Sequence, residues 1–423
     1  MSRRTSAVRI AGILLAAAGL LLITAIVWIR AVESRRWKEM EDALVSLEQE
    51  AMSRSVERPV LVGEPVAGNA WDHYQRAWNV MKGQGGPLLG NYISRAPNVD
   101  REQVLQTIRR LEPALVDLRK GARCGVARRA VDWRNSATQE ISLYALTYLA
   151  VAQAREWAAT GRVHDAVELL LDGARFSADL ASQAECLGYA VSMAGLYTAL
   201  DEIRDLIVGG KLGSADLQLL ESGLDRLDGS FPEPGPALLN GALAMGWELH
   251  RAPSIKALVD PIYSQMQAPR PAIPTWRFAF SERLLIADWF ESQLDRSRSV
   301  AATDKRLWLG MNAAARQADR EVAESKNGLA QVFNLWDRND PHFSVVVVSR
   351  ERRAHLRLLR VAVRYRATGE ISQVGDPFGA GLPQVDKDGR LKVWSVGRDG
   401  ADDGGSGEWR PRAGKDIVLE VSR

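Results

Sequence analysis

The feature that most constrains this chain is a run of twenty residues near its start that contains no charged side chain. The run extends from Ile10 to Ile29 and consists mainly of isoleucine, leucine, alanine and valine. A helix needs about 20 apolar residues to cross the hydrocarbon core of a bilayer, and it satisfies its backbone hydrogen bonds internally. We therefore predict that residues 1–30 form a transmembrane anchor.

A cleaved signal peptide is the alternative explanation of the same run. Signal peptides have a shorter apolar region, which is followed by small residues at the cleavage site. Here the run is long and ends in Trp28, Ile29 and Arg30, a poor context for cleavage. We expect an uncleaved, single-pass anchor in the inner (cytoplasmic) membrane, with the body of the protein outside the cytoplasm.

The basic residues beside the run do not fix this orientation. They are Arg3, Arg4 and Arg9 before it and Arg30, Arg35, Arg36 and Lys38 after it. The positive-inside rule compares these two groups, and the comparison is nearly a tie. The extracytoplasmic placement rests instead on the C-terminal residues described below.

Composition places the rest of the chain among ordinary globular proteins. The chain has 423 residues, of which 46% are hydrophobic and 25% charged, enough for a substantial core. The net charge of +3 gives no reason to expect nucleic acid as a partner. The two cysteines, Cys124 and Cys186, either form one disulfide or remain as thiols, and the sequence does not decide between these states.

Apolar residues recur at helical spacing through most of the chain after the anchor. Residues 31–68 are predicted to form a helical stalk and an irregular linker, and residues 69–369 a body of several helices. The stalk has too few apolar repeats for a coiled coil, so we expect it to pack on its own domain. A helical hairpin is predicted around Gly161, because glycine commonly ends a helix.

Further helices are expected along the body. They are predicted from Asn69, over 101–120 with a possible break at Pro113, from Ser214 to Leu227, and over 237–250, 275–297, 302–333 and 345–367. The last one is rich in arginine and also has an apolar face. Binding of anionic lipid or nucleic acid by these arginines is one interpretation. We favour a solvated, ion-paired face, since the chain has 52 acidic residues to pair with them.

The pattern changes after Gly369. Two extended runs, 382–385 and 391–396, flank Asp388-Gly389, which is a hairpin signal, and another strand is predicted over 416–421. We therefore predict that residues 370–423 form a small β-hairpin region attached to a mainly α-helical protein.

Residues 374–423 resemble the C-terminus of the major pseudopilins of type II secretion. The matching elements are Asp-Pro-Phe-Gly at 376–379, Trp-Ser-Val-Gly at 394–397, Asp399-Gly400, Gly404-Gly405 and the strand start at Asp416-Ile417. The resemblance implies a calcium ion in the loop, with Asp399 as one ligand and Asp402 or Asp403 as another. Calcium binds carboxylate and carbonyl oxygens, which such a loop supplies. The alternative is a plain acidic turn without metal.

The chain as a whole is not a pilin, because it lacks the processing site before its apolar run and has a large helical middle. It resembles a family of uncharacterised bacterial membrane-anchored envelope proteins, through the anchor, Asn69-Ala70, the hairpin over 154–171 and Tyr365-Arg366 before the Asp-Pro-Phe turn. That resemblance implies no activity. Because millimolar calcium exists outside the cytoplasm, a calcium loop favours the extracytoplasmic placement.

Catalytic motifs are absent from the sequence. There is no HExxH, CxxC, GxSxG or P-loop pattern. We therefore expect an interaction or scaffold module with a protein partner in the cell envelope, and no enzyme. Two alternatives stay open: a secretion- or pilus-associated component that uses a calcium-binding tail, and an unrecognised envelope hydrolase.

Overall fold

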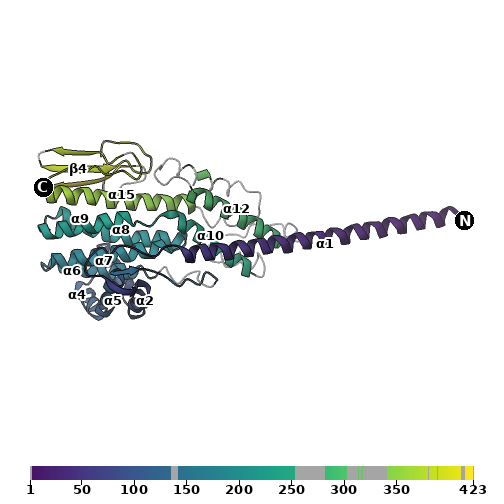
Figure 1. Ribbon diagram of the computed structural model, residues 1–423, viewed down its shortest axis with the longest axis horizontal. Coiled ribbons are helices and arrows are strands. Elements are labelled where there is room, and N and C mark those ends of the chain that lie inside the picture. Colours follow the sequence, from purple (N-terminus) through teal and green to yellow (C-terminus); the bar gives the residue numbers. More distant parts are fainter. Residues whose placement is uncertain are drawn as a thin grey trace.

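The protein is an elongated, mainly helical molecule from which the N-terminal helix projects, with the C-terminus at the opposite end (Figure 1). The computed structural model describes residues 2–134, 142–252, 282–302, 313, 316, 317, 320, 341–379, 381–387, 389–410 and 415–422. The predicted fold class is confirmed: the described residues are mainly helical, begin with a long apolar helix and end in a small antiparallel sheet.

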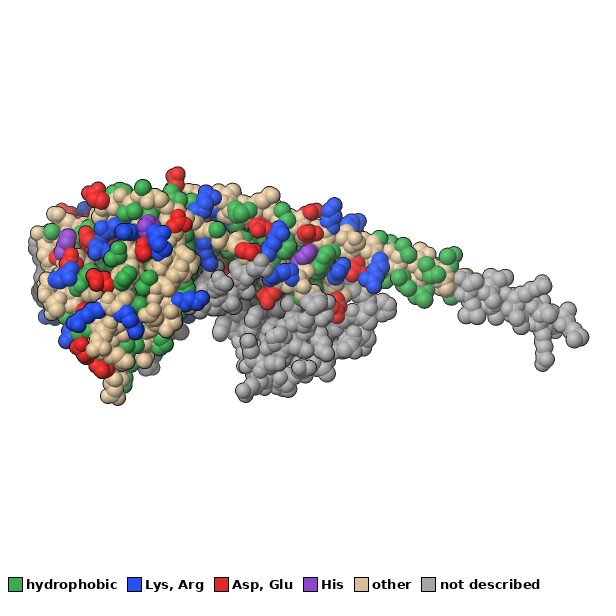
Figure 2. Space-filling view, turned by 90° about the horizontal axis from the view of Figure 1, so that it is seen from below, with side chains coloured by type: hydrophobic (Ala, Val, Ile, Leu, Met, Phe, Trp, Pro, Cys, Tyr) green, Lys and Arg blue, Asp and Glu red, His purple; other side chains and the backbone are tan. Residues whose placement is uncertain are grey.

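The first helix, α1 (Ser2–Ser53), joins the predicted anchor to the predicted stalk without a break. At 1.5 Å per residue, a helix of this length extends about 80 Å. Residues 17–28 are all exposed, and hydrophobic side chains surround this part of the helix (Figure 2). The helix is long and apolar enough to span a membrane.

The second half of α1 packs against the body. Leu44 is fully buried in a cluster with Trp247 of α10 (Pro234–Arg251) and Phe290 of α12 (Glu282–Ala302). The predicted stalk therefore packs on its own domain, as expected, and its core residues belong to the body.

Polar and aromatic contacts hold α1 against the body just N-terminal to this apolar cluster. Arg36 forms ion pairs with Asp288 at 3.0 Å and with Glu291 at 2.7 Å, both on α12. Trp37 stacks on His250 of α10, with ring centroids 4.8 Å apart. The helix is thus fixed to two neighbours directly after its exposed apolar segment.

The centre of the body is a bundle that contains α6 (Ala145–Ala159), α7 (Val163–Ser182), α8 (Cys186–Val208) and α9 (Ser214–Gly229). The predicted hairpin is present between α6 and α7, and Gly161 has a φ of +85°, which glycine adopts without steric cost. Small residues let these helices approach closely. A Cβ on Gly173 would lie 3.3 Å from the Cβ of Ala150.

α7 is the most buried helix of the bundle, and its charged side chains find partners inside the protein. Asp179 and Arg175 are each only 2% exposed. The carboxylate of Asp179 accepts a hydrogen bond from the hydroxyl of Tyr74 at 2.6 Å and pairs with Arg58 at 2.7 Å. Arg175 donates to the hydroxyl of Ser230 at 2.7 Å. These contacts connect the segment after α1 with the centre of the bundle.

Asp172, also on α7, pairs with Arg119 and Arg123, in each case at 3.1 Å. Burial raises the pKa of Asp172 to about 6, and the two arginines oppose that rise. Arg119 lies on α5 (Glu112–Ala122) and Arg123 directly follows it. Because an unpaired buried charge is costly, these pairs hold α5 against the bundle.

α5 belongs to a group of short elements that precedes the bundle. The others are β1 (Val66–Asn69), α2 (Ala70–Met81), α3 (Gly86–Ile93), α4 (Arg101–Arg110) and β2 (Cys124–Val126). The break expected near Pro113 is present, and this proline lies in the first turn of α5, where its missing N–H is not needed. The parallel pairing of β1 with β2 is absent from the sequence prediction, because both strands are too short to show alternation.

Two helix starts differ from the prediction. Gly213, not Ser214, caps α9, and its N–H donates to the carboxylate of Asp216 at 3.0 Å. α10 begins at Pro234, earlier than the predicted residue 237, since a proline in the first turn leaves no helical hydrogen bond unmade. The predicted helix over 302–333 and the start of the one over 275–297 lie largely outside the described residues.

The arginine-rich helix is α15 (Pro341–Thr368). Its predicted ion pairs are present, but the predicted exposure to solvent is wrong, because the paired arginines are half-buried against α9. Arg353, Arg357 and Arg360 all pair with Asp228 of α9, which is buried. Arg360 also pairs with Asp225. These arginines therefore attach α15 to the bundle.

The C-terminal residues form the antiparallel sheet β3 (Gln384–Lys387), β4 (Arg390–Ser395) and β5 (Ile417–Ser422), in the order β3-β4-β5. Leu391 and Val393 of β4 are fully buried and belong to the main core, together with residues of α15. The predicted hairpin and final strand are confirmed.

The two cysteines do not form a disulfide. Both are free, and Cys124 is buried. The Cys124 Sγ lies 3.4 Å from the carbonyl oxygen of Lys120, and the Cys186 Sγ lies 3.6 Å from that of Ala237. Of the two states left open by the sequence, the structure therefore has the thiols.

The docking of α1 predicts a specific loss of stability on truncation of Leu44. Leu44→Ala should lower the free energy of unfolding by about 2–5 kcal/mol, because it opens a cavity in the α1–α10–α12 cluster. Met52→Ala, on the same helix at a side chain that is 54% exposed, should change it by less than about 0.5 kcal/mol. Urea denaturation in detergent measures both. Equal effects of the two variants would contradict the docked arrangement.

Candidate functional site

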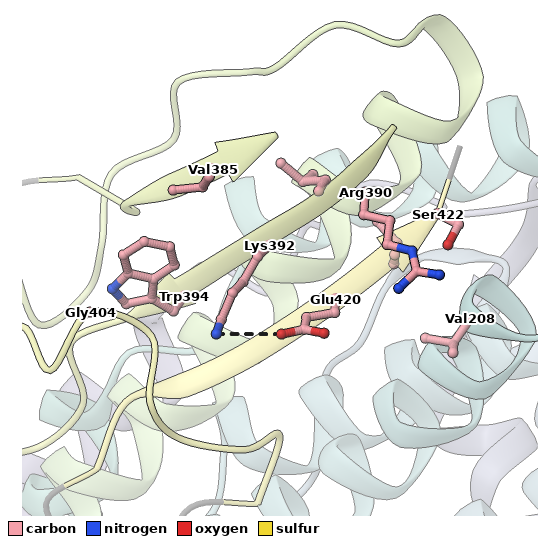
Figure 3. Close-up of a pocket in the computed structure, with 10 residues that line it drawn as sticks. Val208, Val385, Arg390, Lys392, Trp394, Gly404, Glu420 and Ser422 are labelled. Carbon is pink, nitrogen blue, oxygen red and sulfur yellow. Dashed lines mark ion pairs between the residues drawn. The ribbon is translucent and has the colours of Figure 1, made fainter. Parts of the chain in front are cut away.

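An open groove lies on the C-terminal sheet (Figure 3). This sheet is at the end of the molecule away from the N-terminus (Figure 1). Its volume is about 750 Å³. The lining side chains include Arg390, Lys392 and Trp394 from β4 and Glu420 and Ser422 from β5.

The strand register brings these side chains to one face of the sheet. Lys392 lies opposite Val385 of β3 on one side and Glu420 of β5 on the other, and Arg390 lies opposite Ser422. Side chains alternate between the two faces of a strand. Because the alternate residues of β4 are buried toward α15, the groove residues occupy the outer face.

The groove carries an excess of positive charge. The Lys392 Nζ lies 3.4 Å from the carboxylate of Glu420, but these side chains are 37% and 67% exposed, so the pair is weak. Within the described part of the chain, Arg390 has no ion pair. Its guanidinium lies between Ser422 and Val208 (Figure 3). Arg390 is therefore the charged group most available to a ligand.

The loop between β4 and β5 closes one end of the groove. The Trp394 Nε1 donates a hydrogen bond to the carboxylate of Asp402 at 2.9 Å. Gly405 lies directly against the indole, since a Cβ there would be 3.0 Å from the ring. Trp394 is consequently only 6% exposed although it belongs to the outer face.

The Asp-Pro-Phe-Gly turn fixes the sheet from its other side. The carboxylate of Asp376 is buried and accepts hydrogen bonds from the N–H of Phe378 at 2.9 Å, the N–H of Val396 at 2.9 Å and the hydroxyl of Ser395 at 2.7 Å. Burial raises the pKa of Asp376, and these hydrogen bonds oppose the rise. The turn motif thus has a structural role at the end of β4.

Asp416 organises the β4–β5 loop, a role that sequence reasoning missed. It is fully buried and accepts a hydrogen bond from the N–H of Gly405 at 2.8 Å. Gly397 and Gly407 pack against the neighbouring backbone so tightly that no Cβ would fit at either position. In the sequence, the glycines that precede an aspartate at the start of the last strand could have indicated this tightly packed loop.

The three aspartates predicted to bind calcium lie exposed in this loop. Asp399 accepts a hydrogen bond from the backbone two residues on at 3.0 Å, Asp402 is engaged by Trp394, and Asp403 lies 3.5 Å from the Nζ of Lys415. The described residues contain no group of three or more His, Cys, Asp or Glu side chains that could hold a metal ion. Calcium binding by Asp399, Asp402 and Asp403 stays a prediction.

A second, smaller cavity of about 50 Å³ lies between the end of α1, α7 and α10. Its polar lining includes Arg54, Gln183 and Asn240. Neither of these two cavities has a histidine or a pair of carboxylates in its lining. They offer no support for the hydrolase alternative.

A buried histidine joins the tail to the body. His355 of α15 is 3% exposed, and its ring nitrogens lie 2.6 Å and 2.9 Å from the carbonyl oxygens of Glu351 and Trp409. The rings of Tyr197 and Trp409 pack edge-on against it. Burial, with the positive charge of Arg352 as a further cause, lowers the pKa of His355 to about 3.

Comparison of the chain with protein-family models, with curated proteins and with solved structures finds no match. The resemblances to pseudopilin tails and to envelope proteins therefore stay expectations from the sequence.

The buried position of His355 predicts a loss of stability in acid. In the unfolded chain an imidazole has a pKa of about 6.5, so the unfolded state takes up a proton below that pH while the folded state does not. The free energy of unfolding should fall by up to about 1.4 kcal/mol per pH unit from this group as the pH drops from 6.5 toward 3. His355→Gln should lack this contribution.

Urea denaturation of both proteins at pH 7.5, 6 and 5 measures the difference. The comparison isolates His355 because the carboxylates with raised pKa, such as Asp172, are present in both proteins. Those carboxylates make the folded state more stable in acid, which is the opposite of the effect of His355. A stability difference that does not change with pH would contradict the prediction.

Proposed function

We propose that this protein is a single-pass inner-membrane protein whose body lies outside the cytoplasm and acts as an interaction or scaffold module. The observation that carries the proposal is the continuity of α1. One helix contains the exposed apolar segment of residues 17–28 and also the buried residue Leu44. A membrane-spanning helix of this kind holds the body in a fixed relation to the bilayer.

The position of the groove supports the same proposal. α1 leaves the body at one end, and the sheet that bears the groove lies toward the other (Figure 1). A surface placed there is far from the end at which α1 leaves the body and is accessible to other proteins of the envelope. The groove has exposed apolar and basic side chains, Val208, Val385 and Arg390, which is the mixture expected of a binding surface.

Photocrosslinking in cells tests this function. A photoreactive amino acid in place of Val385, at the groove, should give a discrete crosslinked product between this protein and one partner. The same substitution at Val116 is the control, because Val116 is also exposed, at 47%, but lies on α5. Crosslinks of equal yield and identity at both positions, or none at either, would contradict a specific interaction surface.

The second candidate is a secretion- or pilus-associated component with a calcium-binding tail. It is favoured by the antiparallel sheet at the C-terminus and by the position of Asp399 in the glycine-rich loop between β4 and β5. Its biological setting would be the same side of the membrane.

Calcium dependence of the melting temperature tests this second candidate. Ligand that binds only the native state raises stability by mass action. The intact protein should melt at a higher temperature in millimolar calcium than in chelator, and Asp399→Ala should lose that difference. Identical melting temperatures of the parent protein in calcium and in chelator would leave the loop as a structural turn.

A further inference from the structure

We propose that the groove binds an extended, acidic segment of a partner protein, which adds as a strand to the free edge of β5 and places a carboxylate on Arg390. The inference rests on the proposed interaction function and names the chemistry of the partner. Three features of the groove carry it: an open strand edge, an arginine above that edge, and apolar side chains on both sides.

The first feature is the outer edge of β5. The N–H of Trp394 donates toward β3, to the carbonyl of Pro383 at 3.1 Å. Along a strand, the backbone N–H and C=O groups of successive residues point to alternate sides, so those of Lys392 and Arg390 also point toward β3. The β5 residues directly opposite Trp394, Lys392 and Arg390 therefore point their own backbone groups away from β4. The first of them, Val418, donates to the carbonyl of Glu408 at 3.1 Å.

The two residues that follow on this edge leave it open. Among the described residues, the backbone N–H groups of Glu420 and Ser422 have no hydrogen-bond acceptor. An unpaired edge is a ready template for an additional strand, and natural proteins use such edges to bind extended peptides. The open length of β5 accommodates a short segment.

The second feature is the position of Arg390. Its side chain crosses β5, and the guanidinium lies beside Ser422 and Val208, above the place where an added strand would lie (Figure 3). Lys392 has Glu420 as a partner, whereas Arg390 has no partner among the described residues. A carboxylate in the added strand supplies the missing charge, and a guanidinium binds a carboxylate through two parallel hydrogen bonds.

The third feature is the pair of apolar side chains that border the groove. Val208 at the end of α8 is 54% exposed and Val385 on β3 is 51% exposed. In an added strand every second side chain faces this surface. Apolar residues two positions from the acidic one would therefore cover Val208, whereas Val385 on β3 borders the groove beyond β4.

Charge also decides between a foreign segment and a second copy of this protein. Pairing two copies through β5 with Ser422 opposite Ser422 would bring the two copies of Arg390 together, and like charges across a strand pair are destabilising. In the neighbouring register Ser422 faces Glu420, whose carboxylate already pairs with Lys392. A foreign segment with an unpaired carboxylate supplies the charge that a second copy does not.

Binding of defined peptides to the full-length protein in detergent tests the proposal. The probes are nine-residue peptides of alternating valine and serine with a central glutamate, glutamine or lysine, measured by fluorescence anisotropy. The glutamate peptide should bind the parent protein roughly fivefold more tightly than the glutamine peptide. Arg390→Glu should reverse the preference in favour of the lysine peptide.

Two controls sharpen the result. Arg109→Glu makes the same charge change at an exposed arginine of α4 and should leave binding of the glutamate peptide unchanged. Hydrogen exchange should slow at the amides of Glu420 and Ser422 when the glutamate peptide is present, and should slow less at the same concentration of the glutamine peptide. Circular dichroism verifies that both variants are folded.

The proposal is overturned if the glutamate and glutamine peptides bind equally, if no peptide binds, or if the protein self-associates through the groove. It is also overturned if the crosslink from position 385 persists unchanged in Arg390→Glu. That last outcome would leave the interaction function standing, whereas loss of all specific crosslinking in the parent protein would remove the function itself.

Discussion

The neutralisation of charge on α7 is the interaction on which the rest of the body depends. This helix is buried along most of its length, so an ionised side chain on it cannot reach water. Leaving one such charge without a partner costs several kcal/mol. Asp179 and Asp172 therefore need cations. Arg175 of α7 itself lies 3.7 Å from Asp179, and the closer partners come from outside the bundle: Arg58 from the segment after α1, and Arg119 and Arg123 from α5 and the residue that follows it. The short N-terminal elements are thereby tied to the bundle centre.

The position of Arg58 links this charge network to α1. Arg58 follows α1 by only a few residues, and α1 is itself held by the α10–α12 cluster and by the ion pairs of Arg36. Apolar packing supplies most of the free energy at that contact, because exposed ion pairs contribute little. Arg36 adds two ion pairs with α12 at the same contact.

The tail uses acidic residues for a different purpose. Asp376 and Asp416 are buried carboxylates that accept backbone N–H groups, and together they hold the turn before β3 and the loop before β5. With the sheet fixed on α15, its outer face is left to present Arg390 and Lys392. The same short segment therefore contains residues that build the sheet and residues that are free to bind.

The sequence by itself determined the long apolar N-terminal helix, the helical hairpin at Gly161, the split near Pro113 and the C-terminal hairpin. Each of these depends on local periodicity or on a backbone preference of glycine or proline, which a linear pattern records. Only the tertiary structure decided that anchor and stalk are one helix docked on α12, that β1 pairs with β2, and that the cysteines remain apart. It also placed Arg390 beside Val208, residues that are 182 positions apart in the sequence. Contacts of this kind depend on how distant elements pack, and neither spacing nor composition along the chain encodes that packing in a readable form.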